Sequence, residues 1–260
     1  MLRFTANLSL LFTELPWSER FKAARQHGFQ AVEIQFPYHL PAEQILAALQ
    51  ENSLKLVLFN VDADTLLQGG EGLAAVPENR EAFRAAVAQA MTYAKILQPE
   101  VINVLPGRCL DKQRLPEYLQ TFKANLRYAA ESFAPLGIKT VFEAVNTLDM
   151  PNFIIADSLT MLEVLAEIEL PLLGLQYDIY HMTMMGEDCQ RFIQQHADKI
   201  LHIQFADYPG RGQPGTGSID FDKLFALIAA VDYQGWVGAE YRPLGLTPTT
   251  LHWLNAAHRC

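Results

Sequence analysis

Four polar residues stand directly after short apolar runs in the second half of the chain: Glu143, Asp178, Gln204 and Glu240. The intervals between them are 35, 26 and 36 residues, about what one strand, one helix and two loops consume. If the four runs are neighbouring strands of a parallel barrel, their side chains meet at its C-terminal mouth. The spacing therefore predicts one cluster built from four strand ends.

Three carboxylates and one amide oxygen in such a cluster would repel one another unless a hard divalent cation lay among them. An all-oxygen ligand set suits Mg²⁺ or Mn²⁺ better than Zn²⁺, and no close group of His and Cys has the spacing of a structural zinc site. A single acidic residue after a strand commonly caps the next helix instead. Because four successive strand ends carry such a residue, helix capping by chance at all four is the weaker explanation. The sequence does not distinguish Mg²⁺ from Mn²⁺.

Two further residues are candidates for binding a substrate. His181 follows Asp178 by three residues, so its ring could point back to the mouth and hydrogen-bond a substrate oxygen; the alternative is a surface histidine at a helix start. Three carboxylates with one divalent cation leave about one net negative charge, so an acid substrate needs a nearby cation. Arg211 is the candidate, with Arg242 and Arg108 as alternatives that would otherwise be solvated.

His202 precedes Gln204 by two residues and shares its face of the strand, deeper in the barrel. There it would orient a metal-binding side chain and would not itself bind the metal.

The elements that must position these residues alternate as strand and helix eight times. The expected strands are Phe4–Leu8, Ala31–Phe36, Lys55–Asn60, Val101–Leu105, Lys139–Glu143, Leu172–Asp178, Ile200–Gln204 and Gly235–Glu240. The expected helices are Pro16–His27, Pro41–Asn52, Pro77–Leu97, Leu115–Leu136, Ser158–Glu169, Cys189–His196, Phe221–Val231 and one within Thr247–Ala257. This pattern predicts an α/β fold, a single (β/α)8 TIM-barrel domain over residues 1–260.

Composition excludes several classes of function. The formal charge is −9, which argues against nucleic acid and against an anionic membrane surface. The cysteines Cys109, Cys189 and Cys260 have no paired spacing, which favours a reduced compartment. The apolar start of the chain is interrupted by polar residues and reads as a strand and not a signal peptide, so we expect a cytoplasmic protein without a membrane span. The oligomeric state is open, and a homo-oligomer is compatible with the sequence.

Over nearly its whole length the sequence resembles the hydroxypyruvate isomerase family, within the xylose isomerase-like barrels. The motifs that carry the resemblance are Gln176–Met182, His202–Gly217 and Gly235–Tyr241. The resemblance implies that Glu143, Asp178, Gln204 and Glu240 hold a divalent metal. Related ketose 3-epimerases generally carry histidine where this chain has Gln204, so the glutamine favours the isomerase branch. Asn60 and the segment Asp62–Leu73 resemble the branch proposed to isomerise 2-oxo-tetronates.

The function implied is a metal-dependent aldose–ketose type isomerisation of a small keto or hydroxy acid. The substrate would be hydroxypyruvate, giving tartronate semialdehyde, or a 2-oxo-tetronate. Glu143 and Glu240 would act as acid and base through a cis-enediolate, and the sequence does not decide which removes the first proton. The alternative is a 3-epimerase-like enzyme with the same ligands. A barrel nuclease would need zinc-binding histidines and a basic surface, and a non-catalytic sugar-acid binder would not need both glutamates.

Overall fold

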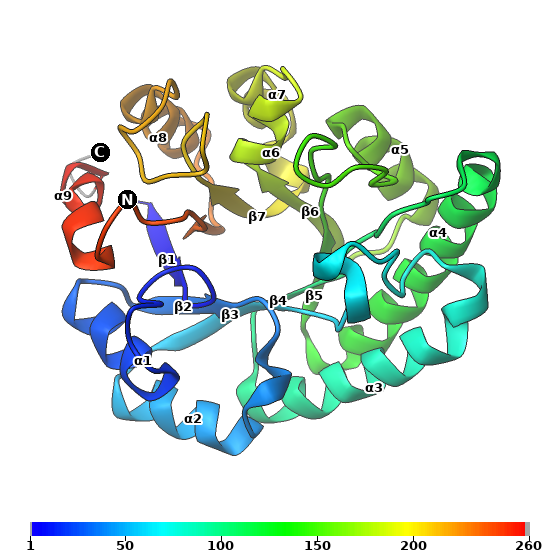
Figure 1. Ribbon diagram of the computed structural model, residues 1–260, viewed down its shortest axis with the longest axis horizontal. Helices are drawn as coiled ribbons and strands as arrows, with labels where there is room; N and C mark the ends of the chain where they lie inside the picture. The colour runs from blue at the N-terminus through cyan, green and yellow to red at the C-terminus, as the bar shows by residue number, and fades with distance from the viewer. Residues whose placement is uncertain (1, 258–260) are drawn as a thin grey trace.

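Eight parallel strands close into a barrel, in which each strand pairs with the next along the chain and β8 pairs with β1 (Figure 1). The computed structural model describes residues 2–257, leaving out the side chains of residues 255–257. The strands are β1 (Arg3–Asn7), β2 (Ala31–Ile34), β3 (Lys55–Asn60), β4 (Val101–Asn103), β5 (Lys139–Phe142), β6 (Leu173–Asp178), β7 (Ile200–Phe205) and β8 (Trp236–Ala239). The predicted TIM-barrel fold is confirmed.

Helices surround the barrel and cover its outer face (Figure 1). They are α1 (Trp17–Gln26), α2 (Ala42–Glu51), α3 (Arg80–Leu97), α4 (Leu115–Phe133), α5 (Ser158–Ile168), α6 (Ile179–Met184), α7 (Cys189–His196), α8 (Phe221–Ala230) and α9 (His252–Ala257). Within the described residues, none of them combines the length and apolar character that a membrane span requires.

Two elements depart from the sequence-based expectation. No separate helix is expected between Asp178 and Cys189, but the segment after β6 forms α6, which starts where the Asp178 carboxylate accepts a hydrogen bond from the backbone N–H of His181 at 3.1 Å. Asp is a favoured residue at such a helix start. The long connection after β3 contains a 3₁₀ turn, Asp64–Gln68, which places Leu66 and Leu67 beside the barrel mouth. Short helices are hard to read from sequence because they contain too few residues to show a period.

The barrel interior changes from apolar to polar along the strands. Its N-terminal end is filled by an apolar cluster that includes Ala31, Val101 and Val141. Successive inward-facing positions of a strand are two residues apart. Two residues beyond Ala31 and Val141, the same strands carry the buried Glu33 and Glu143. The polar layer of the barrel interior therefore lies directly above this apolar cluster. The outer faces of the strands pack against the helices in a separate, larger core.

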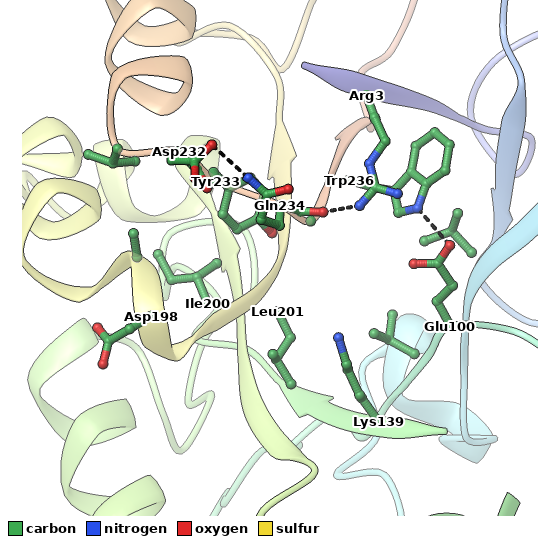
Figure 2. A pocket seen from close by; sticks show the side chains of 15 residues that line it. Arg3, Glu100, Lys139, Asp198, Ile200, Leu201, Asp232, Tyr233, Gln234 and Trp236 are labelled. Carbon is green, nitrogen blue, oxygen red and sulfur yellow. Dashed lines mark hydrogen bonds between the residues drawn. The ribbon is translucent and has the colours of Figure 1, made fainter. Parts of the chain in front are cut away.

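A cavity of about 380 Å³ opens at the N-terminal end of the barrel, opposite the strand ends that carry the predicted site (Figure 2). Several of its polar groups are paired with one another. Trp236 Nε1 donates to Glu100 at 2.9 Å, and the Arg3 guanidinium donates to the Gln234 carbonyl and lies 4.7 Å from the Trp236 ring centre. These contacts tie β1, β8 and the start of β4 together. This end of a TIM barrel commonly serves stability.

The described cysteines are consistent with the expectation of free thiols. Cys109 and Cys189 are both buried and unpaired. Burial raises the pKa of each thiol above its ordinary value. Cys260 lies outside the described residues.

Candidate metal centre and active site

The four predicted ligands lie at the C-terminal ends of four neighbouring strands. Each is at most 5% exposed. Asp178 is the register partner of Gln204 in the β6–β7 pair, and the backbone N–H of Glu240 donates to the carbonyl of Phe205 at 3.0 Å. Glu143 follows directly after β5, which pairs with β6. The fold thus brings the ends of β5, β6, β7 and β8 to one mouth.

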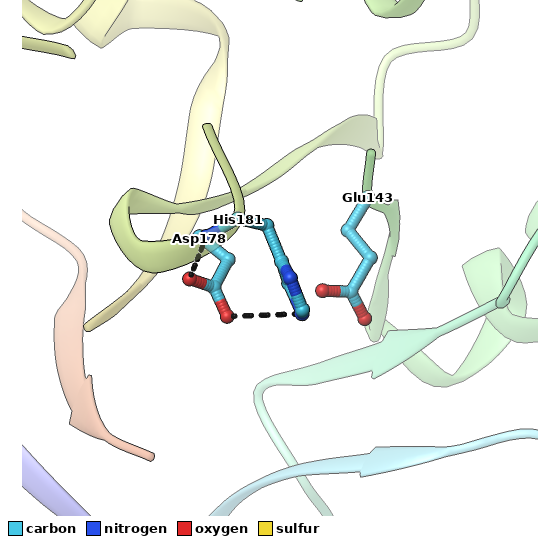
Figure 3. Close-up of side chains that lie close together, drawn as sticks. All are labelled: Glu143, Asp178 and His181. Carbon is cyan, nitrogen blue, oxygen red and sulfur yellow. Dashed lines mark hydrogen bonds and ion pairs between the residues drawn. The ribbon is translucent and has the colours of Figure 1, made fainter. Parts of the chain in front are cut away.

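Three side chains at this mouth are close enough to share a cation. Glu143, Asp178 and His181 each offer a ligand atom, and these atoms lie within 4.8 Å of one another (Figure 3). Burial and the nearby Glu240 and Asp178 carboxylates raise the pKa of Glu143 well above its ordinary value. The donor set therefore fits a divalent cation, because three buried carboxyl groups converge here and the Arg211 guanidinium compensates them only in part.

His181 has one nitrogen fixed as a hydrogen-bond acceptor. Asn146 Oδ1 accepts from the backbone N–H groups of Leu148 at 3.1 Å and Asp149 at 2.7 Å, which orients the amide with Nδ2 toward the ring. Asn146 Nδ2 lies 2.6 Å from His181 Nδ1. Burial lowers the pKa of His181 to about 4, so the ring is neutral near pH 7. The proton of the neutral ring is therefore on Nε2, 3.7 Å from Asp178 Oδ2. In this tautomer Nε2 carries a proton and faces Asp178 at a separation longer than a hydrogen bond, so within the group of three the lone pairs open to a cation are those of Glu143 and Asp178.

Glu240 is held by amide groups and by one arginine. Its Oε1 accepts from Asn7 at 2.9 Å and from Gln35 at 3.0 Å, and its Oε2 accepts from Arg211 Nη2 at 2.6 Å. Burial raises the pKa of Glu240 to about 7, although Arg211 opposes the shift. This carboxyl group is therefore poised to take up and release a proton near neutral pH.

Arg211 reaches the mouth from the loop between β7 and α8. That loop is folded around Asp207, whose Oδ2 accepts from the backbone N–H groups of Gly215 at 2.9 Å and Gly217 at 2.8 Å. A Cβ at Gly217 would lie 2.1 Å from the Tyr208 carbonyl oxygen, so only glycine fits there. The loop glycines form turns that hold Arg211 in place with its guanidinium in contact with Glu240.

Gln204 makes three contacts through the two ends of its amide. Its Nε2 donates to Glu33 at 2.8 Å and to Glu240 Oε1 at 3.4 Å, and its Oε1 accepts from Gln176 Nε2 at 2.7 Å. His202 is fully buried on the same strand face, as expected from strand alternation, but its Nε2 contacts Glu33 at 2.8 Å and not Gln204.

A cavity of about 70 Å³ lies over this cluster. The polar part of its lining includes Glu143, His181 and Glu240. The apolar part of the lining consists of Phe36, Leu66, Leu67, Leu105, Val145, Met150 and Phe153. A cavity of this size and polarity suits a small polar molecule.

Several polar residues at the site lie outside the set predicted from the strand ends. Asn103 Nδ2 donates to Glu143 at 2.8 Å, and Asn7, Glu33, Gln35 and Gln176 contact the ligand candidates as described above. The signal in the sequence is a polar residue inside an otherwise apolar strand. Of the alternative arginines, Arg242 is exposed and Arg108 Nη2 lies 2.9 Å from Met150 Sδ.

Comparison with known proteins identifies close relatives. The family model described as the xylose isomerase-like TIM barrel matches residues 21–257. Hydroxypyruvate isomerase of Escherichia coli K12 is 40% identical over 255 residues, covering 98% of this chain and 99% of the relative. A 2-oxo-tetronate isomerase of Pectobacterium atrosepticum is 38% identical over 253 residues, covering 97% of each. The crystal structure of an AP endonuclease, family 2, from Brucella melitensis has a TM-score of 0.94 at 35% identity, covering 98% of this chain and 99% of that one.

Proposed function

The chain belongs to the xylose isomerase-like TIM barrel family, and from that membership we propose that it isomerises a small keto or hydroxy acid. The observation that carries the proposal is a pair of buried carboxyl groups, Glu143 and Glu240, that line one small cavity and both have a raised pKa. Two such groups suit a reaction in which a proton leaves one carbon and returns at its neighbour.

We assign a divalent cation, Mg²⁺ or Mn²⁺, to the side-chain oxygens of Glu143, Asp178, Gln204 and Glu240. When bound, the cation supplies Lewis-acid polarisation of the substrate oxygens. The support for this assignment is the charge of the site, because buried carboxylates converge there and Arg211 is the cation paired with them.

The two glutamates move the proton. For hydroxypyruvate, one carboxylate removes a proton from the hydroxymethyl carbon to give a cis-enediolate. A carboxylic acid then delivers a proton to the neighbouring carbon, while the hydroxyl proton moves from one oxygen to the other. The product is tartronate semialdehyde, with the same atoms as the substrate. A group of this kind contributes about 10²–10⁴-fold to the rate.

Arg211 and His181 bind the substrate in this proposal. The Arg211 guanidinium is suited to the acid group of the substrate, since it presents paired donors to a carboxylate. The His181 Nε2–H is a neutral donor that faces Asp178 at the metal site and is suited to a substrate oxygen. Both side chains line the cavity with the glutamates.

The test is an isomerisation assay on hydroxypyruvate and on a four-carbon 2-oxo-tetronate, with and without EDTA, followed by NMR in D₂O. We expect the carbonyl to move to the neighbouring carbon, deuterium to enter at the carbon that receives the proton, and EDTA to stop the reaction. A rate that EDTA does not change would contradict the metal assignment. A product with an inverted centre and an unmoved carbonyl would assign a 3-epimerase instead.

A further inference from the structure

A buried carboxylate that the proposed reaction does not use lies inside the barrel, in contact with one of the assigned metal ligands. Glu33 of β2 is fully buried. Its Oε1 lies 2.8 Å from His202 Nε2 and also accepts a hydrogen bond from the Thr5 hydroxyl. Its Oε2 accepts from Gln204 Nε2 at 2.8 Å. The partners come from β1 and β7, so one carboxylate connects three strands.

The barrel leaves room for this carboxylate at Gly238 of β8. A Cβ at position 238 would lie 2.1 Å from Glu33 Oε1 and 3.0 Å from Oε2. The backbone of Gly238 is outside the left-handed region, so its conformation does not require glycine. Glycine is therefore needed at position 238 because a side chain there would occupy the space of the Glu33 carboxylate, and not because of its backbone conformation.

Two carboxylate oxygens face the nitrogen end of the Gln204 amide, Glu33 Oε2 at 2.8 Å and Glu240 Oε1 at 3.4 Å, and the contact with Glu33 is the shorter. An ionised carboxylate only accepts hydrogen bonds, so the amide group that faces it is the NH₂. The oxygen of Gln204 is then turned toward Gln176, which lines the active-site cavity. The reverse orientation would set two oxygen atoms against each other.

We propose that Glu33 is a positioning residue that orients the Gln204 amide so that its oxygen is presented to the divalent cation. The inference rests on the proposed function, because the cation site belongs to it. Glu33 does not touch the substrate or the cation in this role. It acts through Gln204, and the absence of a side chain at Gly238 leaves the space that its carboxylate occupies.

Glutamine at position 33 cannot replace the carboxylate. The glutamine amide carries no charge and can turn either its oxygen or its NH₂ toward Gln204, because the Thr5 hydroxyl can accept as well as donate, so the orientation of the Gln204 amide is no longer enforced. Loss of such a supporting contact typically lowers metal affinity about 10–100-fold.

The experiment measures Mn²⁺ binding to the full chain after removal of metal with EDTA and dialysis, by calorimetry and by electron paramagnetic resonance. Glu33→Gln should weaken binding about 10–100-fold relative to wild type. The matched control is Thr140→Val, which removes a fully buried hydroxyl on β5 that has no hydrogen-bond partner among the described residues. The control should bind Mn²⁺ as wild type does.

A second background separates positioning from a general structural role. In Gln204→Ala protein, adding Glu33→Gln should change Mn²⁺ affinity by less than about twofold, because the residue through which Glu33 acts is gone. Equal losses in both backgrounds would overturn the inference. So would a Glu33→Gln protein whose melting temperature in EDTA falls while its Mn²⁺ affinity stays at the wild-type value.

The variant Gly238→Ala tests the same inference if the Glu33→Gln protein does not fold. It leaves every hydrogen-bonding group in place, but its Cβ displaces the Glu33 carboxylate, so Mn²⁺ binding should weaken at least tenfold. Full Mn²⁺ affinity in Gly238→Ala would refute the role of Glu33. If wild-type protein itself binds no Mn²⁺, the proposed metal function fails, which is a distinct result from unchanged binding in the variants.

Discussion

Replacing Glu143 with glutamine should stabilise the metal-free protein while removing nearly all turnover. The substitution keeps the side chain's size, and its oxygen can still accept the hydrogen bond from Asn103 Nδ2, which measures 2.8 Å in the wild-type site. It removes the negative charge whose burial, beside Glu240 and Asp178, raises the pKa of Glu143. The fold should therefore remain intact.

The size of the stabilisation follows from the spacing of the carboxylates. Ligand atoms of Glu143 and Asp178 lie within 4.8 Å of each other. Two unit charges at that distance repel by about 3 kcal/mol at an effective dielectric constant of about 20. For a protein of this size, each kcal/mol shifts the melting temperature by roughly 2–4 °C. The gain should therefore be about 6–12 °C where Glu143 of the wild type is fully ionised.

The gain should depend on pH in a defined direction. The folded-state pKa of Glu143 is raised, so its contribution to stability is present in full below the unfolded pKa and is lost as pH rises through the folded pKa. Metal-free wild type should thus lose stability toward alkaline pH relative to Glu143→Gln. The difference between their melting temperatures should be small near pH 5 and largest near pH 9.

The assay is thermal unfolding in EDTA from pH 5 to pH 9, paired with turnover of hydroxypyruvate in Mn²⁺. Turnover should fall about 10²–10⁴-fold, and the control Glu163→Gln, at an exposed position of α5, should change neither property. A Glu143→Gln protein that melts at the wild-type temperature at every pH would refute the electrostatic reasoning. One that turns over at the wild-type rate would refute the catalytic assignment.

Three further predictions concern metal, substrate and thiols. Adding Mn²⁺ at 100 times its dissociation constant should stabilise chelated wild type by about 2.7 kcal/mol, and an unchanged melting temperature would exclude binding to the folded state. Arg211→Met should raise KM for the acid substrate roughly 10–100-fold through loss of a charged hydrogen bond, with a smaller change in kcat; steady-state kinetics that show the reverse would place Arg211 outside substrate binding. Because burial raises the pKa of Cys109 and Cys189, both thiols should react slowly with a disulfide reagent at pH 7 in folded protein, and rapid labelling by mass spectrometry would contradict their burial.

The barrel was predictable because its signals repeat. Apolar runs that end in polar residues at regular intervals fix the direction and order of the strands, and β3 and α7 have the predicted bounds. The convergence of Glu143, Asp178, Gln204 and Glu240 follows from that regularity, since parallel strands in a barrel end at the same face.

The supporting contacts were less accessible to sequence reasoning. Asn146 lies in a loop, and its contact with His181 depends on two backbone N–H groups that orient its amide. Glu33 is 171 residues from Gln204 in the chain, and their contact requires the closure of the barrel. A single sequence carries the residue types but not the distances between side chains on different strands.

The site satisfies its buried carboxylates largely with neutral amides. Asn103 donates to Glu143, Asn7 and Gln35 donate to Glu240, and Gln204 donates to Glu33. An amide donor fills a lone pair of the carboxylate without cancelling its charge, whereas the Arg211 guanidinium on Glu240 Oε2 compensates charge as well. The carboxylates at the mouth of the barrel are therefore hydrogen-bonded but keep most of their negative charge. A divalent cation would compensate that charge, and without it the repulsion between the carboxylates lowers the stability of the folded protein.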